Sequence, residues 1–379
     1  MEALPIPIAR PLLGTEEEDA VHRVLVSGQL AQGEHVAAFE RRFAEVCRVR
    51  EAVAVSSGTA ALHLALLAHD IGPGDEVITS AFSFAATANA VLLAGATPVF
   101  VDIERDTYTI DPALVEAALT PRTKAIMPVH LYGHPCEMQR LGSLAAIHGL
   151  VIIEDACQAH AAAIDGKPVG SFGTGCFSFY ATKNMTTGEG GMVTTNDPGV
   201  AERVRLLRSH GQQERYLHTT LGYNLRMTEM QGALGLVQVE KLEQFTEQRI
   251  ANAAFLTERL GGSVHTPIAR PGYRHVYHQY TIRVPEHREG WAMRLRSRGI
   301  GTAVHYPLAI HQQPFYRDHR GIWRCIGAPA KMSAERTTGD VRLPVTEMAA
   351  EQVLSLPVHP ALSREDLLTI AREVRALCD

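Results

Sequence analysis

The chain has 379 residues, of which 46% are hydrophobic and 20% are charged, an ordinary composition for a protein that buries a large core. This composition excludes a disordered, collagen-like or low-complexity protein. The formal net charge is −5, from 36 basic and 41 acidic residues, so the chain has no basic excess with which to bind nucleic acid. At about 150 residues per domain we expect two or three domains, or one large α/β domain with an appendage.

The cysteines and the N-terminal residues indicate a cytoplasmic protein. The six cysteines, at positions 47, 136, 157, 176, 325 and 378, form no C-x-x-C pair, which argues against a zinc site or a redox motif. Six cysteines in a chain of this length are typical of packed thiols in a reducing compartment rather than of a disulfide framework. The first eight residues include two prolines and no basic n-region, so they do not resemble a signal peptide.

Strands alternate with helices over the first two-thirds of the chain. Each apolar run is short and is followed by a segment with the length and capping residues of a helix, which indicates βαβ units and a mostly parallel sheet. The predicted strands are Glu51–Val55, Glu76–Thr79, Thr97–Val101, Thr123–Val129 and Leu150–Glu154. The predicted helices between them run from 59 to about 69, from about 83 to 94, from 112 to 119 and near 137–148.

One segment in this region is long enough to cross a membrane. The 25 residues from Val77 to Val101 carry no charge, and a transmembrane helix needs about 20 apolar residues. However, the segment contains serine, threonine and asparagine, and the turn at 95–98 divides it. We therefore expect a strand, a buried helix and a second strand in a soluble protein.

The pattern changes after about residue 175. Two short strands, Gly175–Tyr180 and Gly190–Thr195, flank the loop Ala181–Glu189, and a long helix is predicted from Thr228, with Gln231 completing a capping box, to about Leu260. The remaining predicted elements are a strand at His278–Val284, a helix near Gly290–Arg298, a strand at Gly301–His305 and a helix at Arg364–Leu377. We therefore predict a large domain over residues 1–240 and a smaller α+β domain over 241–379, joined by the helix 228–260.

Common nucleotide and metal motifs are absent or incomplete. The sequence Gly173-Thr-Gly175 lacks the third glycine of a dinucleotide fingerprint and leads into a strand, which argues against a nicotinamide dehydrogenase. His130 and His134 have the i,i+4 spacing of metal ligands on a helix, but Gly133 and Pro135 disfavour a helix there. We expect no metal site.

Three other features carry chemical information. Ser57-Gly58-Thr59 joins a strand to a helix, where free amide groups and the helix dipole form an anion site. Asp155 follows the strand Leu150–Glu154 and is expected to face the ligand crevice, although it could instead cap a turn. Lys183 lies among small, polar and glycine residues between two strands, where a lysine with a lowered pKa can attack a carbonyl, although an ordinary loop lysine is the alternative.

The three features together suit pyridoxal phosphate. The phosphate of this cofactor needs an anion site, its aldehyde needs an amine, and its pyridine nitrogen needs an acidic partner. Ser57–Thr59, Lys183 and Asp155 supply these groups in turn.

The sequence resembles the DegT/DnrJ/EryC1/StrS family of sugar aminotransferases, within the fold-type I pyridoxal-phosphate enzymes. The resemblance runs nearly from end to end and rests on several sequence blocks. These blocks are Ser57-Gly-Thr-Ala-Ala-Leu62, Phe82-Ser-Phe-Ala-Ala-Thr-Ala-Asn89, Glu154-Asp-Ala-Cys-Gln-Ala-His160, Ser178-Phe-Tyr-Ala-Thr-Lys-Asn184, Gly188-Glu-Gly-Gly191, Gly222-Tyr-Asn-Leu-Arg-Met-Thr-Glu229 and Val304-His-Tyr-Pro307. The resemblance implies an α/β fold in which a mostly parallel seven-stranded sheet lies between helices, followed by a smaller C-terminal α+β domain.

The resemblance also implies roles for individual residues. Lys183 forms a Schiff base with the cofactor and then shuttles a proton, and Asp155 pairs with the pyridine nitrogen. Gln158 reaches the ring hydroxyl and Phe84 stacks on the ring, although Phe84 could instead be a core residue. The remaining cofactor contacts bind the phosphate: Ser57, Gly58, Thr59 and Ser178 from one subunit and Asn224 from the other, which implies a homodimer with shared active sites.

The implied reaction is transfer of the amino group of glutamate to a keto group on a nucleotide-linked deoxysugar. Position 183 is lysine, whereas the related sugar dehydratases carry histidine there. The candidate substrate contacts are Tyr132, Tyr223, His305 and Tyr306, each of which could equally be a packed polar residue. The alternatives are a keto-cyclitol aminotransferase and a regulatory protein that binds the cofactor without turnover. The sequence does not distinguish amination at C3 from amination at C4.

Overall fold

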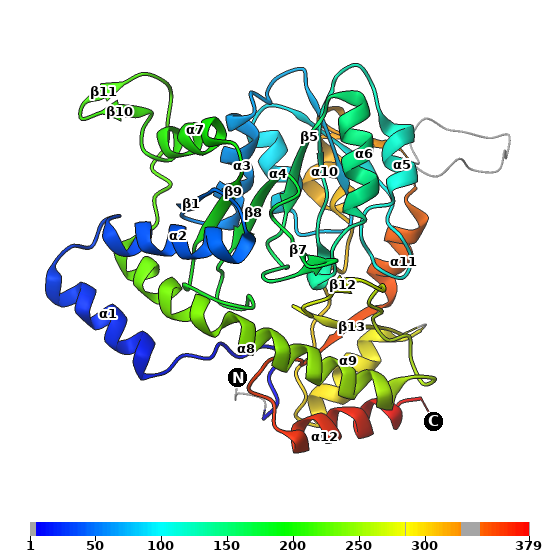
Figure 1. Ribbon diagram of the computed structural model, residues 1–379. Helices are drawn as coiled ribbons and strands as arrows, with labels where there is room; N and C mark the ends of the chain where they lie inside the picture. The colour runs from blue at the N-terminus through cyan, green and yellow to red at the C-terminus, as the bar shows by residue number, and fades with distance from the viewer. Residues whose placement is uncertain (1–4, 285, 327–341, 379) are drawn as a thin grey trace, which may run out of the picture.

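The computed structural model describes residues 5–284, 286–326 and 342–378. Among them, eight strands form one sheet in the order β1-β9-β8-β5-β4-β2-β3-β14, and β9 is antiparallel to both of its neighbours (Figure 1). The strands are β1 (Glu51–Val55), β2 (Glu76–Ser80), β3 (Thr97–Val101), β4 (Thr123–Met127), β5 (Val151–Asp155), β8 (Thr174–Ser178), β9 (Gly191–Thr195) and β14 (Arg324–Ile326). The first seven match the predicted strands, and β14 adds an eighth at the edge beside β3.

Helices cover both faces of this sheet because successive side chains of each strand point in opposite directions. In β1, Val53 and Val55 join the core beneath α3 (Gly58–Ala68), α4 (Ala86–Leu93) and α7 (Pro198–Arg208). Ala52 and Ala54 face the other side, where α2 (Glu34–Cys47) packs. Further along the same face, α5 (Pro112–Ala118) and α6 (Met138–His148) cover β2, β3 and β4. The result is the three-layer α/β fold that the sequence predicts.

The uncharged stretch from Val77 to Val101 folds as predicted, into β2, α4 and β3. Its strand residues other than Thr97 are buried in the centre of the sheet, and its helix packs against α3. Among the described residues, no helix combines the length and the apolarity that crossing a bilayer requires.

Helix α8 (Glu229–Leu260) is the long helix predicted from residue 228. Thr228 and Gln231 form the expected capping box at its N-terminus. The first residue of α8, Glu229, accepts hydrogen bonds from the backbone amides of Gly33, His35 and Val36, and so caps α2. Helix α1 (Thr15–Ser27) also packs against α8, so this helix links the N-terminal segment to the rest of the molecule.

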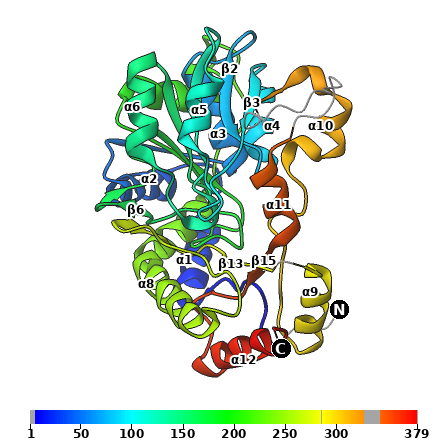
Figure 2. The same ribbon diagram turned by 90° about the vertical axis from the view of Figure 1, so that its right-hand side faces the viewer.

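A second core lies beneath the C-terminal half of α8 (Figure 2). It contains the antiparallel pair β13 (Tyr280–Arg283) and β15 (Val353–Leu356), together with α9 (Arg288–Ser297) and α12 (Arg364–Arg375). The strand predicted at Gly301–His305 is wrong. Gly301 bonds to Ile6 and Ala303 bonds to Ser355, so this segment alternates between two partners instead of pairing along one strand.

Parts of the C-terminal third pack against the large sheet. Besides β14, helix α10 (Pro314–Asp318) contacts the layer around Phe100, and α11 (Pro344–Gln352) packs near Phe82. The division of the chain at residue 240 therefore stays a prediction. The remaining short elements are β6 (Ala163–Ile164), β7 (Lys167–Pro168), β12 (Tyr273–Arg274), the projecting hairpin β10 (Gln212–Glu214) and β11 (Leu217–His218), and the 3₁₀ turns Leu131–Gly133, Ile310–Gln312 and Arg320–Ile322.

Candidate active site

A cleft of about 520 Å³ lies where several strands of the large sheet end. Strands β1, β5 and β8 all end at this edge of the sheet. Strands β5 and β8 are parallel neighbours, and β1 runs in the same direction because the strand between β8 and β1, β9, is antiparallel to both. Ten of the predicted site residues line the cleft together: Ser57, Gly58, Thr59, Phe84, Asp155, Gln158, Ser178, Lys183, His305 and Tyr306. Ligands of open α/β sheets bind at this kind of edge.

The N-terminus of α3 forms one wall of the cleft. Ser57 caps the helix by accepting a hydrogen bond from the amide of Ala60 at 3.1 Å. The first amides of a helix have no partner within the helix, and within the described part of the chain those of Gly58 and Thr59 have no acceptor. Ser178, at the end of β8, lies against Gly58. This wall therefore offers amide and hydroxyl donors to an anion.

Glu154 and Asp155, the last two residues of β5, point in opposite directions and have different roles. Glu154 points into the protein and accepts hydrogen bonds from the amides of Gly170, Phe172 and Gly173, so it holds the loop before β8. Asp155 points the other way, lines the cleft and is 5% exposed. Its Oδ2 accepts a hydrogen bond from the hydroxyl of Thr87 at 2.7 Å.

Asp155 also caps the short turn that follows β5, which was the alternative for this residue. The amide of Cys157 donates to Oδ1 at a long 3.3 Å, and no helix begins there. Among the described residues, no lysine or arginine forms an ion pair with Asp155. A buried carboxylate without a cationic partner is suited to bind a cationic group of a ligand.

Lys183 lies in the turn that follows β8. Its backbone amide bonds to the carbonyl of Tyr180 at 2.9 Å, and the neighbouring Asn184 donates to the carbonyl of Val276 at 3.2 Å, which fixes the turn. Burial lowers the pKa of Lys183 because the ammonium loses hydration, and this effect exceeds the opposing influence of Cys157 and Asp155. A lowered pKa increases the fraction of neutral, nucleophilic amine.

Gln158 is held between two tyrosines. Its side-chain oxygen accepts the backbone amide of Tyr132 at 2.8 Å, and its nitrogen donates to the hydroxyl of Tyr306 at 3.1 Å. The second proton on this nitrogen is left for a ligand in the cleft. Gln158 can therefore present a donor to an oxygen acceptor.

Phe84 is 59% exposed at the cleft and lies 6.0 Å from the ring of Tyr306. This exposure contradicts the alternative in which Phe84 is a core residue of an apolar helix. An exposed aromatic face at a cleft is available to stack on a planar ligand.

Three predicted residues do not line the cleft of this chain. Tyr132 is 3% exposed, and its hydroxyl donates to the carbonyl of His305, so it lies behind the cleft wall rather than in it. Tyr223 packs edge-on against His63 at 5.3 Å. Asn224 is exposed, and its backbone pairs with Ser209 near the projecting hairpin β10–β11. The contact predicted for Asn224 was with the cofactor phosphate in the other subunit.

Several residues that line the cleft were not predicted, namely Ser83, Thr87, Cys157, Tyr180, Thr182, Glu189, His278 and Gln279. Ser83 and Thr87 have an i,i+4 spacing and are hydrogen-bonded at 2.8 Å, and the first donates because Thr87 gives its own proton to Asp155. Two polar residues at helical spacing within an uncharged stretch are the signal that could have identified them. His278 and Gln279 directly precede β13, and no local pattern indicates their position.

The imidazoles in the cleft are neutral. The pKa of His305 is lowered to about 4, first because of burial and second because of Lys183. Burial and Lys183 also lower the pKa of His278 well below its ordinary range. The cleft therefore presents histidine lone pairs or N–H groups rather than imidazolium charge at neutral pH.

Neither His130 nor His134 has the surroundings of a metal ligand. His130 bonds to Glu154 at 3.1 Å and accepts the amide of Cys136, whereas His134 stacks on Tyr273. In the described ranges, no three histidine, cysteine, aspartate or glutamate side chains are grouped to bind a metal ion.

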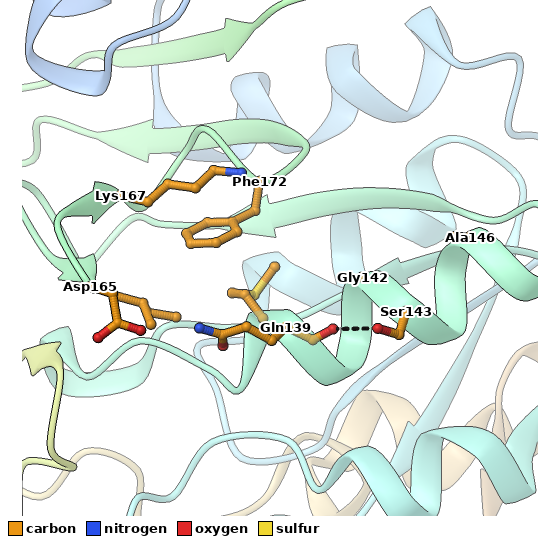
Figure 3. A pocket seen from close by; sticks show the side chains of 9 residues that line it. Gln139, Gly142, Ser143, Ala146, Asp165, Lys167 and Phe172 are labelled. Carbon is orange, nitrogen blue, oxygen red and sulfur yellow. Dashed lines mark hydrogen bonds between the residues drawn. The ribbon is translucent and has the colours of Figure 1, made fainter.

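A second hollow, of about 580 Å³, lies between α6 and the β6–β7 turn. Figure 3 shows Lys167, whose ammonium lies 4.3 Å from the centre of the Phe172 ring, and Ser143, whose hydroxyl donates to the carbonyl of Gln139. None of the predicted site residues lines this hollow. The predicted site residues that line a cavity therefore line the cleft at the ends of β1, β5 and β8 and not this hollow.

Known proteins resemble this chain over nearly its whole length. A relative from Geobacillus stearothermophilus, named a pleiotropic regulatory protein, is 43% identical over 93% of this chain and 91% of its own. The dTDP-3-amino-3,4,6-trideoxy-alpha-D-glucose transaminase of Streptomyces venezuelae is 42% identical over 98% of this chain and 94% of its own. The UDP-N-acetyl-3-dehydro-alpha-D-glucosamine 3-aminotransferase of Acidithiobacillus ferrooxidans is 42% identical over 94% of this chain and 92% of its own.

Solved structures also resemble this chain over nearly its whole length. The structure of DesV from S. venezuelae in complex with a ketimine intermediate has a TM-score of 0.89 at 41% identity, covering 96% of this chain and 95% of its own. A putative sugar aminotransferase of Streptococcus pneumoniae, solved in its PLP form, has a TM-score of 0.89 at 28% identity and covers 98% of both chains. The model of the DegT/DnrJ/EryC1/StrS aminotransferase family matches residues 11–375, and the chain therefore belongs to that family.

Proposed function

We propose that this protein is a pyridoxal-phosphate-dependent aminotransferase that transfers the amino group of glutamate to the C3 keto group of a nucleotide-linked sugar. The observation that carries the proposal is the meeting of Lys183, Asp155 and the N-terminus of α3 in one cleft. The choice of carbon is supported by the names of the S. venezuelae and A. ferrooxidans relatives, both of which specify nitrogen at position 3 of a nucleotide-linked sugar.

The residues of the cleft fit the cofactor. The free amides of Gly58 and Thr59, with Ser57 and Ser178, would hold the phosphate. Asp155 would hold the proton on the pyridine nitrogen, because its carboxylate is buried and lacks a cationic partner among the described residues. Gln158 would donate to the ring hydroxyl, and Phe84 would cover one face of the ring.

Pyridoxal phosphate supplies an aldehyde that bonds to amines and a ring that withdraws electrons from the adjacent carbon. Lys183 is the amine in the cleft, and its lowered pKa favours the neutral form that can bond to a carbonyl or accept a proton. In the exchange between donor and acceptor, Lys183 Nζ would take a proton from one carbon and return it to another. The carboxylate of Asp155 would stabilise positive charge on the ring nitrogen.

We also propose that two copies of the chain share their active sites. Asn224 does not reach the cleft of its own chain, and it lies at the base of the projecting hairpin β10–β11. The hairpin and the segment after it carry the exposed apolar side chains Tyr216, Leu217 and Leu221, which suits a surface that a partner covers. Asn224 of the partner subunit would then contact the phosphate.

A mixing experiment tests this sharing. Lys183→Ala and Asn224→Ala are each expected to be poorly active as homodimers. In a mixed dimer, one of the two sites combines the intact lysine of one chain with the intact asparagine of the other, so activity should return to about half that of the wild type. If the mixture stays as inactive as its parents although mixed dimers form, Asn224 does not act across the interface.

We place the protein in the cytoplasm. Cys47, Cys136 and Cys176 are buried free thiols, as expected for a reducing compartment. Labelling of intact host cells with a thiol reagent that cannot cross membranes should leave the protein unmodified, and labelling at Cys378, which is exposed, would contradict this location.

A regulatory role is a second candidate because the G. stearothermophilus relative is named a regulatory protein. A protein that binds the cofactor without turnover does not need the lysine and the aspartate together with a cleft open to a substrate, and this chain keeps all three. We therefore favour catalysis, and turnover of a keto sugar is the distinguishing observation.

The substrate assignment is tested by incubating the protein with pyridoxal phosphate, glutamate and, separately, a nucleotide-linked 3-keto sugar, the 4-keto isomer and a keto-cyclitol. Mass spectrometry should detect the amino product from the 3-keto sugar first. A preference for the 4-keto sugar or for the cyclitol would contradict the proposed acceptor while keeping the reaction class. Lys183→Ala should give no product with any of them.

A further inference from the structure

Two hydroxyl groups at the edge of the cleft connect Asp155 to the start of α4. The Thr87 hydroxyl donates to Asp155 Oδ2 at 2.7 Å, and the Ser83 hydroxyl lies 2.8 Å from that of Thr87. A threonine hydroxyl has one proton, and that of Thr87 is used on Asp155, so Ser83 is the donor to Thr87. Both hydrogen bonds therefore point towards the carboxylate.

These three side chains line the cleft and are nevertheless shielded from bulk water. Their exposed fractions are 4% for Ser83, 1% for Thr87 and 5% for Asp155. A hydrogen bond to a charged group is stronger where water is scarce, because the local dielectric constant is low and no solvent competes for the acceptor. The Thr87 hydroxyl therefore has more influence on this carboxylate than the same contact would have at the protein surface.

Thr87 does not use its proton within its own helix. A buried threonine in a helix can donate to the carbonyl four residues before it, as Thr246 of α8 does to Leu242 at 2.8 Å. The proton of Thr87 goes instead to Asp155, 68 residues further along the chain, and its oxygen accepts from the side chain four residues before it. The hydroxyl of Thr87 is thus directed at the carboxylate of the cleft.

Thr87 also makes the shorter of the hydrogen bonds to the Asp155 side chain. The amide of Cys157 donates to the other oxygen, Oδ1, at 3.3 Å. The thiol of Cys157 donates elsewhere, to the carbonyl of Cys176 at 3.6 Å. Loss of the Thr87 hydroxyl would therefore leave the carboxylate with a long backbone hydrogen bond at one oxygen and without its close donor at the other.

The turn that carries Thr87 also carries Phe84. The amide of Thr87 donates to the carbonyl of Phe84 at 3.1 Å, and the ring of Phe84 is exposed at the cleft. In the proposed function, Phe84 covers one face of the cofactor ring and Asp155 faces the ring nitrogen. One turn of the chain therefore supports both contacts with the ring.

We propose that Thr87, supported by Ser83, is a positioning residue that keeps the proton on the ring nitrogen of the cofactor by donating to Asp155. The proposal rests on the proposed function, because it takes pyridoxal phosphate as the ligand. A proton shared between a carboxylate and a ring nitrogen stays on the more basic of the two. A hydroxyl that donates to the carboxylate makes it less basic, so the proton stays on nitrogen and the ring keeps its power to withdraw electrons.

Nitrogen NMR of the holoenzyme, reconstituted with pyridoxal phosphate that carries ¹⁵N in its ring, tests the proposal directly. The chemical shift of the ring nitrogen distinguishes its protonated from its unprotonated form, and the wild type should show the protonated form at neutral pH. In Thr87→Val the signal should move towards the unprotonated position, and Thr87→Ser, which keeps the hydroxyl, should restore it. A wild-type signal in Thr87→Val would overturn the proposal, and so would a signal in Thr87→Ser that matches that of Thr87→Val.

Two further variants control for damage to the fold. Thr246→Val removes another buried threonine hydroxyl, which bonds to Leu242 within α8, and it should leave the ring signal unchanged. If Thr87→Val does not fold, Ser83→Ala takes its place: the Thr87 hydroxyl then loses the donor that orients it, so the signal should move in the same direction by a smaller amount. An unchanged signal in Ser83→Ala, or a moved signal in Thr246→Val, would show that the two hydroxyls do not control the ring proton.

Kinetics of the half-reaction with glutamate give a second measurement. In Thr87→Val the maximal rate should fall by about threefold to tenfold, as for one lost hydrogen bond, while the KM for glutamate stays at the wild-type value. A raised KM at an unchanged maximal rate would place Thr87 in glutamate binding and would contradict the proposal.

The NMR experiment also separates this proposal from the proposed function. If the wild type binds no pyridoxal phosphate, the proposed function fails. If the cofactor binds and its ring nitrogen is unprotonated in the wild type, the role of Asp155 fails. If the nitrogen is protonated in the wild type and equally in Thr87→Val, only the role of Thr87 fails.

Discussion

Gly58 is the position at which the smallest change should have the largest effect on the proposed phosphate site. A Cβ atom at this residue would lie 2.7 Å from Ser178 Cβ and 3.0 Å from Cys157 Sγ. Carbon atoms pack at about 3.5–4.0 Å, so Gly58→Ala requires a shift of about 1 Å between α3 and the end of β8. Overpacking of this kind should lower the free energy of unfolding by about 1–3 kcal/mol.

The same shift moves the free amides of Gly58 and Thr59 away from the phosphate. Weakening one hydrogen bond to a charged group costs about 1.5–3 kcal/mol, so the Kd for pyridoxal phosphate should rise by at least about tenfold. Urea denaturation of the cofactor-free protein measures the first effect, and titration of the cofactor absorbance measures the second.

Gly142→Ala is the matched control. Gly142 lies inside α6, and apart from its chain neighbours and the backbone of its own helix no atom lies within 4 Å of the position of a Cβ there. Alanine in a helix interior should therefore raise the free energy of unfolding by about 0.5–1 kcal/mol, without a change in cofactor affinity. If Gly58→Ala matches the wild type in stability and in Kd, the account of the phosphate site is refuted.

Three other changes test separate parts of the structure. Asp155→Asn removes the carboxylate that we propose lies beside the ring nitrogen, and it should lower kcat by about 10- to 100-fold, the equivalent of one charge-assisted hydrogen bond. Steady-state kinetics within twofold of wild type would contradict this role. Glu154→Ala leaves three amides without an acceptor, one of them buried and two partly buried. Urea unfolding should therefore show a loss of about 3 kcal/mol, and a loss below about 1 kcal/mol would mean that water replaces the carboxylate. Burial among phenylalanine rings lowers the pKa of His160 to about 3. Between pH 6.5, the ordinary pKa of histidine, and pH 3, His160 therefore binds a proton in the unfolded chain but not in the folded chain. Stability should fall as the pH falls from 6.5 towards 3, and His160→Phe should reduce this slope in urea titrations at pH 7 and pH 4.5, whereas an unchanged slope would assign the acid sensitivity to other groups.

The parts of the site that the sequence predicts are those that follow strands. Ser57–Thr59, Asp155 and Ser178 each come at the end of a strand, and the ends of these strands meet at one edge of the sheet. The strand pattern and the residue types were therefore enough to bring Ser57–Thr59 and Asp155 together, whereas Ser178 was predicted only from the family resemblance. Lys183 lies in the turn after one of these strands, so its place follows from the same argument.

The parts that the sequence did not predict depend on contacts between distant segments. Tyr132 was a candidate substrate contact because of its residue type, but its hydroxyl is bound to His305 and its ring is buried. The strand expected at Gly301–His305 failed because this segment divides its hydrogen bonds between Ile6 and Ser355. Such pairings are decided by tertiary packing and leave no local pattern in the sequence.

Strand β14 was missed for a different reason. It is three residues long, Arg324–Ile326, and among the described residues it pairs with β3 alone, at the edge of the sheet. A segment this short shows no alternation of polar and apolar residues, so it cannot be distinguished from a loop. Helices α1 and α2, which precede the first predicted strand, were not predicted either, although the buried face of α2, with Phe39 and Phe43, is regular.

The most direct test of the central claim is the absorbance spectrum of the purified protein with pyridoxal phosphate, before and after excess glutamate is added. We expect a visible band from the cofactor bound to Lys183, and we expect glutamate to bleach it as the amino group is transferred. The band should be absent in Lys183→Ala. A visible band that persists with glutamate would contradict glutamate as the donor, and the absence of any band in the wild type would contradict the role of Lys183 itself.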